Sequence, residues 1–207
     1  CALPIYNENK TLALNAVTGS WQLTQGGTIQ GGTVMATDGA GLLVPQVGVG
    51  ILAGVTLGTD VMVGDTGILT VTQGLTLQGA TVTLAGQGSG SPILRFEGTQ
   101  TVAGTGALVF GGQISSAVYV FGDQQTPATL TLGPGIAVQA QQHGSIYSGT
   151  GGDQVLLKGT LAVATPGTIL TVTAPLTNQG AITVSNGGRL TLTNLLNEAA
   201  VTVMDAA

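Results

Sequence analysis

A short unit, made of a small turn that contains glycine followed by an apolar strand, recurs along the chain. Its copies centre on Gly31, Gly54, Gly79, Gly104, Gly135, Gly159 and Gly180, and on Ala199 in the last copy. The steps between these positions run from 19 to 31 residues, with a mean of about 24. The last two copies, 176–184 and 195–203, align without a gap. Self-similarity at a fixed period is typical of repeat architectures, in which each unit packs only on its neighbours.

Within each copy the apolar residues follow a period of two. Apolar and hydroxyl residues alternate in 69–72 and in 82–84, as expected of half-buried strands. No stretch repeats its apolar residues every 3.6 positions over the length of a helix. Segments 12–17 and 195–200 are the two weak helical candidates, and both are short. We therefore expect an all-β fold with almost no helix.

Several short strands per period of about 24 residues fit one coil of a parallel β-solenoid. Because a single coil cannot bury its apolar residues, it must stack, and we expect about eight coils. The repeated glycines are expected at the corners, where a positive φ costs glycine nothing. Asn178 and Asn197 occupy equivalent positions. They are expected either to form an asparagine ladder at one corner or to be two independent turn residues.

The chain divides into two parts by repetitiveness. Residues 18–207 are expected to form the solenoid domain, and residues 1–17 a less repetitive segment that acts as a cap or an arm. The last copy ends close to the end of the chain, so its coil would be uncovered. The residues expected to meet in a head-to-tail contact between subunits are Leu3, Ile5, Leu12, Leu14, Val201 and Val203.

Composition excludes several classes of partner. The net charge is −5 and the four basic residues are scattered, so no basic patch is expected for nucleic acid. The uncharged stretch 39–59 resembles a membrane helix in hydropathy, but Pro45, its glycines and its place in the repeat argue against a transmembrane segment. Cys1 is the only cysteine. It fits either a processed or fragmentary N-terminus or a lipidated cysteine.

The nine acids and the single histidine are the candidates for a catalytic or metal-binding group. On a solenoid, acids of neighbouring coils could meet as Asp38 with Asp60 or Asp65, or as Asp123 with Asp153. All of these occupy turn-like positions, where Asp favours the turn itself. Arg95 and Glu97 share a strand face and are expected to form an exposed ion pair. His143 has no partner for a metal site or a triad. We expect no catalytic residue, metal or cofactor.

Pairs of threonines two apart suggest a further alternative. They occur at 70/72, 81/83, 129/131, 171/173 and 191/193. Stacked in register, such pairs would form the flat threonine array of an ice-binding solenoid. Because they recur at irregular steps, we expect no face to collect them all, and threonine is in any case a good outward strand residue.

The segments 26–34, 94–102, 130–138, 176–180 and 185–188 resemble the repeats of large bacterial surface proteins, similar to autotransporter passenger domains and filamentous adhesins. The resemblance covers about residues 18 to 204 and is compositional. It implies a right-handed β-helix outside the cell, secreted or at the surface, and it assigns no functional residues. We therefore expect a structural or adhesive element that self-associates, with a surface carbohydrate or a protein receptor as a candidate partner. The alternatives are a carbohydrate-active β-helix enzyme and an ice-binding solenoid.

Overall fold

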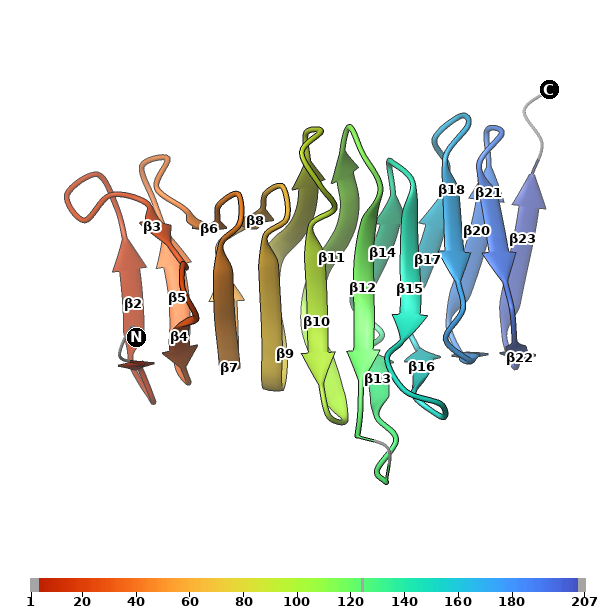
Figure 1. The fold of residues 1–207 in the computed structure, drawn as a ribbon, viewed down its shortest axis with the longest axis horizontal. Coiled ribbons are helices and arrows are strands. Elements are labelled where there is room, and N and C mark those ends of the chain that lie inside the picture. The colour runs from red at the N-terminus through yellow and green to blue at the C-terminus, as the bar shows by residue number, and fades with distance from the viewer. Residues whose placement is uncertain (1–3, 124, 205–207) are drawn as a thin grey trace.

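The chain is described by a computed structural model in which residues 4–123 and 125–204 are placed. These residues form a parallel β-solenoid of about nine turns. The turns follow one another in chain order along the long axis, from the N-terminal turn at one end to the C-terminal turn at the other (Figure 1). The described residues contain 23 strands and no helix, and every pairing between strands is parallel.

Each turn contributes a strand, or part of a long strand, to three ladders that run along the solenoid. The first ladder contains β1 (Ile5–Tyr6), β4 (Gly27–Gln30), the start of β7 (Val49–Gly58), the start of β9 (Ile68–Gly86), β10 (Ile93–Glu97), β12 (Ser116–Phe121), β15 (Gly144–Ser148), β18 (Ile169–Val172) and β21 (Arg189–Leu192).

The second ladder contains β2 (Thr11–Leu14), β5 (Thr33–Ala36), the end of β7, the middle of β9, the start of β11 (Gln100–Gly112), β13 (Thr129–Leu132), β16 (Gln154–Leu157), β19 (Leu176–Asn178) and β22 (Leu195–Asn197). The third contains β3 (Trp21–Gln22), β6 (Leu42–Val44), β8 (Val61–Val63), the ends of β9 and β11, β14 (Ile136–Ala140), β17 (Thr160–Val163), β20 (Ala181–Ser185) and β23 (Ala200–Met204).

The alternation read in the sequence decides which side chains form the core. In β10, Leu94 and Phe96 are fully buried, while Arg95 and Glu97 point outward. Inward residues of successive turns lie over one another, as in the register of Leu69, Leu94 and Val118. The core is therefore a continuous column of Leu, Val and Ile with two phenylalanines, Phe96 and Phe110.

The spacing of in-register residues varies as widely as the spacing of the repeated glycines. In-register partners are 19 residues apart at Val44 and Val63 but 30 apart at Leu108 and Val138, because the turns between strands differ in length. The uncharged stretch 39–59, which resembles a membrane helix in hydropathy, lies in β6, in β7 and in the turns around them. The two weak helical candidates also lie in strands and turns, β2 and β22 among them.

The first turn of the solenoid precedes Gly31, the first of the repeated glycines. Ile5 pairs with Ile29, and Leu12 with Val34, so strands in segment 1–17 already belong to the solenoid. Its first corner contains Asn9 at φ 56° in place of a glycine, so a search based on glycine passes over it.

The repeated glycines divide between two corners. Gly31 and Gly54 lie between the first and second ladders, whereas the other five lie between the second and third. Gly31, Gly54, Gly79 and Gly104 have positive φ. Gly135, Gly159 and Gly180 do not have positive φ, so glycine is required there for another reason. A Cβ atom at each would overlap a backbone carbonyl oxygen of the preceding turn, so glycine permits the close approach of successive corners.

Candidate functional site

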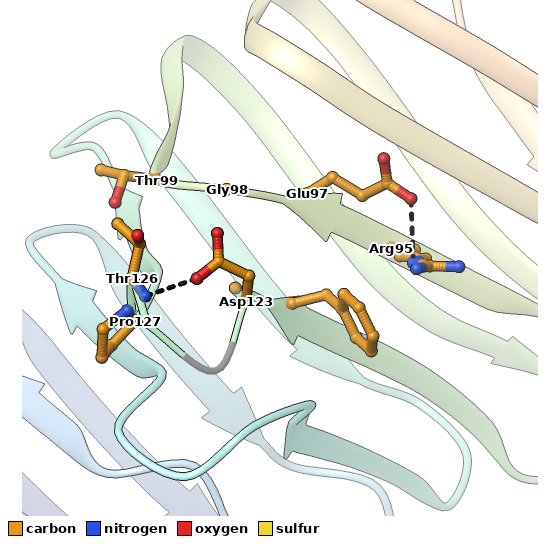
Figure 2. A pocket seen from close by; sticks show the side chains of 9 residues that line it. Arg95, Glu97, Gly98, Thr99, Asp123, Thr126 and Pro127 are labelled. Atoms are coloured by element: carbon orange, nitrogen blue, oxygen red, sulfur yellow. Dashed lines mark hydrogen bonds and ion pairs between the residues drawn. The ribbon is translucent and has the colours of Figure 1, made fainter.

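A shallow hollow of about 420 Å³ opens on the outer side of the first ladder, in the fifth and sixth turns (Figure 2). One side is built by the end of β10 and the residues that follow it, from Arg95 to Thr99. The other side is the loop that leaves β12, of which Phe121, Asp123, Thr126 and Pro127 line the hollow. The strand register brings the two sides of the hollow together, because Glu97 pairs with Phe121 although 24 residues separate them.

Arg95 lies at the centre of this site. Its guanidinium carbon is 4.3 Å from the centroid of the Phe121 ring, which is a cation–π contact. Its Nε atom is 3.2 Å from Glu97 Oε1, so the ion pair expected from the sequence is present. The buried Nε–H has no hydrogen-bond partner among the described residues. The Phe121 ring and the Glu97 carboxylate together hold the guanidinium in place.

Two further aromatic side chains continue the site along the ladder. Tyr119 pairs with Arg95 on one side and with Tyr147 on the other. The rings of Tyr119 and Tyr147 lie 5.1 Å apart and are tilted by 32°. A second, more apolar hollow of about 190 Å³ is lined by Ile68, Ile93, Arg95, Tyr119 and Phe121. The two hollows share Arg95 and Phe121, so they form one elongated surface, named here the aromatic groove.

The loop on the far side of the groove is fastened by a buried carboxylate from the next turn. Asp153 is fully buried, and its Oδ1 accepts hydrogen bonds from the backbone N–H groups of Gly122 at 3.2 Å and Ala128 at 2.8 Å. Its Oδ2 accepts from the Thr150 N–H at 2.7 Å and from the Thr150 hydroxyl at 2.9 Å. The two ends of the loop are therefore drawn onto one side chain.

The pKa of Asp153 reflects two opposing effects. Desolvation raises the pKa of a buried carboxyl, but the hydrogen bonds from Ala128, Thr150 and Gly122 outweigh it, and the pKa lies below its usual value. Asp65, in the turn between β8 and β9, also has a lowered pKa. The N–H of Gln87, followed by that of Ser89, lowers the pKa of Asp65 and ties the turn after β9 to the preceding turn of the solenoid.

The other acids considered as catalytic pairs also serve turns. Asp60 accepts the Thr81 N–H at 2.8 Å, and Asp123 accepts the N–H groups of Gln125 and Thr126 within its own loop. Asp38 hydrogen-bonds with the neighbouring Thr37 hydroxyl. Within residues 4–123 and 125–204, no group of three or more His, Cys, Asp or Glu side chains is arranged to hold a metal ion.

His143 and the two ladder asparagines have structural partners. The Nδ1 atom of His143 accepts the Ile169 N–H at 3.0 Å, again between neighbouring turns. Asn178 is fully buried, and its Nδ2 donates to Asn197 Oδ1 at 2.7 Å, with which it is in register. Asn178 Oδ1 accepts the N–H of Gly180, so the side chain also shapes the corner.

The threonine pairs fall on all three ladders. Thr70 lies on the first, Thr81 and Thr83 on the third, and Thr129 and Thr131 on the second. A threonine column that the sequence reading missed runs along the second ladder, through Thr11, Thr33, Thr56 and Thr76. It is one residue wide and ends at Ala103, so it offers a narrow stripe.

The last described turn leaves apolar side chains uncovered. Val201 is in register with Ile182 and Val203 with Val184, so both belong to inward columns, yet they are 44% and 70% exposed. In the first turn, Ile5 and Leu12 are half-buried and Leu14 is buried. Leu3 and Cys1 lie outside the described residues.

Comparisons with protein-family models, with curated proteins and with solved structures found no match to this chain. The fold places the protein in the class of parallel β-solenoids. Among the placed residues, no helix is long and apolar enough to cross a membrane.

Proposed function

We propose that this protein is a structural β-solenoid outside the cell, secreted or on the surface, whose turns stack head to tail with a second copy to form a rod. The observation that carries the proposal is the uncovered last turn. Val201 and Val203 belong to inward columns, and none of the described residues packs over them, whereas Ile182 in the turn below Val201 is 1% exposed. Exposed apolar surface together with unpaired strand edges is normally covered by something.

The first turn of another copy has the chemistry to cover it. Within residues 4–123 and 125–204, each ladder has an unpaired edge at either end, because β1, β2 and β3 pair only with strands of the second turn and β21, β22 and β23 only with strands of the eighth. All strands of a ladder run in the same direction, so a second copy can extend all three ladders with the same parallel pairing.

Side chains at the two ends are also compatible. Each ladder contributes one large apolar inward residue at each end. In the last turn these are, from the first to the third ladder, Leu192, Leu195 and Val201. In the first turn they are Ile5, Leu12 and Trp21. Such a contact joins different surfaces of two identical molecules, so it does not close on itself and builds a linear assembly. Further turns of a longer surface protein would meet the same need within one chain.

Support for the extracellular location is the composition and the resemblance to bacterial surface repeats. Low charge, few aromatics and repeated Gly and Thr are shared with autotransporter passengers and filamentous adhesins. A catalytic role has less support, because Asp60, Asp65, Asp123 and Asp153 are all engaged in turn hydrogen bonds.

Electron microscopy of the purified chain tests the proposal. Nine turns at a strand spacing of 4.7–4.9 Å give about 40 Å per copy. We expect rods of constant width whose lengths are multiples of this value, growing with protein concentration. Single particles of one length at every concentration would contradict stacking between copies.

A further inference from the structure

We propose that the aromatic groove binds a neutral oligosaccharide. The inference is independent of the stacking proposal, because the groove lies on the lateral surface of the middle turns. Three of the chain's seven aromatic residues, Tyr119, Phe121 and Tyr147, gather on the outer side of two neighbouring strands. Outward aromatics are not needed by the core, since Phe96 and Phe110 already fill it.

The aromatic rings are held in defined positions. A Cβ atom at residue 149 would overlap the Phe121 ring, so Gly149 leaves the room that lets this ring lie against the turn after β15. Arg95 packs on the ring, and Tyr119 is held between Arg95 and Tyr147. Aromatic side chains fixed before a ligand arrives lose little conformational entropy on binding.

Polar groups surround these rings in the pattern that a sugar requires. Pyranose rings present apolar C–H faces and a rim of hydroxyl groups, so they are recognised by aromatic surface combined with planar hydrogen-bonding side chains. Arg95 provides a planar, positively charged group, and Glu97 and Asp123 provide acceptors on the two sides of the larger hollow (Figure 2). The loop with Asp123 is itself anchored by Asp153.

Charge and geometry select among ligand classes. One arginine faces two carboxylates, so an anionic glycan or a nucleic acid would meet net repulsion. An extended peptide would need a free strand edge, but β10, β12 and β15 are paired on both sides. The larger hollow has a volume typical of small-molecule sites, and its continuation past Tyr119 favours several linked sugar units.

Calorimetric titration of the purified chain with neutral tetrasaccharides of glucose, mannose, galactose and N-acetylglucosamine, and with an acidic tetragalacturonate, tests the proposal. We expect at least one neutral tetrasaccharide to bind and Tyr119→Ala, which removes a ring that lines the smaller hollow, to weaken that binding about tenfold or more. Tyr6→Ala is the matched control, because Tyr6 is an exposed tyrosine of the first ladder far from the groove, and it should bind as the parent does.

Glu97→Gln keeps the aromatic surface and removes one charge, so it provides a second test if Tyr119→Ala fails to fold. Its affinity for the same neutral sugar should fall severalfold while its melting temperature stays close to that of the parent. No binding of any neutral tetrasaccharide at about 10 mM, binding of tetragalacturonate alone, or equal weakening by Tyr6→Ala would each overturn the assignment.

Discussion

The carboxylate of Asp153 accepts a hydrogen bond from the backbone N–H of Ala128 at 2.8 Å, between neighbouring turns and 25 residues apart in sequence. The same side chain accepts from Gly122 and Thr150, so it joins the base of one loop to the turn of the next. Because Asp153 is fully buried, water does not reach the N–H groups of Gly122 and Ala128 to replace the carboxylate as their acceptor.

Replacing Asp153 by Ala should destabilise the protein by about 3–5 kcal/mol, because the buried N–H groups of Gly122 and Ala128 and the partly buried N–H of Thr150 lose their acceptor at about 1–3 kcal/mol each. Asp123→Ala is the control, since that carboxylate closes an exposed turn within its own loop. Urea unfolding of both variants measures the difference. A loss at position 153 no larger than at position 123 would show that the anchor contributes nothing.

The pH dependence of stability should follow the same side chain. The pKa of Asp153 is lowered in the folded state, as is that of Asp65, so the unfolded state binds more protons as the pH falls. The stabilisation is fully present above the unfolded pKa of about 4 and is lost as the pH drops through the folded pKa. Asp153→Asn should therefore show a flatter profile of melting temperature below about pH 4 than the parent; parallel profiles would contradict this.

Glycine at the corner between the second and third ladders should be replaceable only at a high cost. A Cβ at Gly159 would overlap the Ile136 carbonyl oxygen, so Gly159→Ala should force the corner apart and destabilise by roughly 2–4 kcal/mol. Gly41→Ala is the matched control, because nothing lies within 4 Å of a Cβ there. Thermal melting of the two variants compares them, and similar melting temperatures would mean that the turns can separate freely.

The equivalent leucines of the last two turns should respond differently to a buried charge. Leu176 and Leu195 are in register, but Leu176 is 3% exposed and Leu195 is 36% exposed. Leu176→Asp should lower the free energy of unfolding by about 3 kcal/mol or more, because its carboxylate would have no partner in the core. Leu195→Asp should cost the monomer much less. Equal losses in chemical unfolding would show that the last turn is covered in the isolated chain.

Much of the fold could be predicted because its cause is local. The alternation in 69–72 and 82–84 determines which side of the strand is buried, and the gapless alignment of 176–184 with 195–203 gives the register that pairs Leu176 with Leu195. The first turn could not be predicted from the glycine repeat, because Asn9 has the positive φ at its corner. The glycine spacing alone does not separate the two corners, and Gly54 and Gly79 belong to different ones.

The aromatic groove could not be predicted from spacing. Tyr119 and Tyr147 are 28 residues apart, well above the mean period, because the turns and loops between β12 and β15 are long. A register error of a few residues would place Tyr147 on another column. Asp153 was likewise read as an ordinary turn acid, since its partners at Gly122 and Ala128 depend on the path of a loop rather than on the repeat.

The proposed structural role predicts that the protein leaves polysaccharides intact. Incubation with neutral and acidic polysaccharides, followed by separation of the products by size, is expected to show no shorter fragments and no new reducing ends. Turnover that disappears in Asp123→Asn or Glu97→Gln would instead make the groove the active site of a carbohydrate-active enzyme.

Head-to-tail stacking of the solenoid is tested most directly by sedimentation velocity over a range of protein concentrations. The parent chain should show a weight-average sedimentation coefficient that rises steadily with concentration, as in an open linear assembly. Val203→Lys places a charge in the uncovered inward column and should remain monomeric, whereas Met62→Lys, at an exposed position of β8 in the third turn, should associate like the parent. A parent chain that stays monomeric at every concentration, or that stops at a closed dimer, would contradict the account.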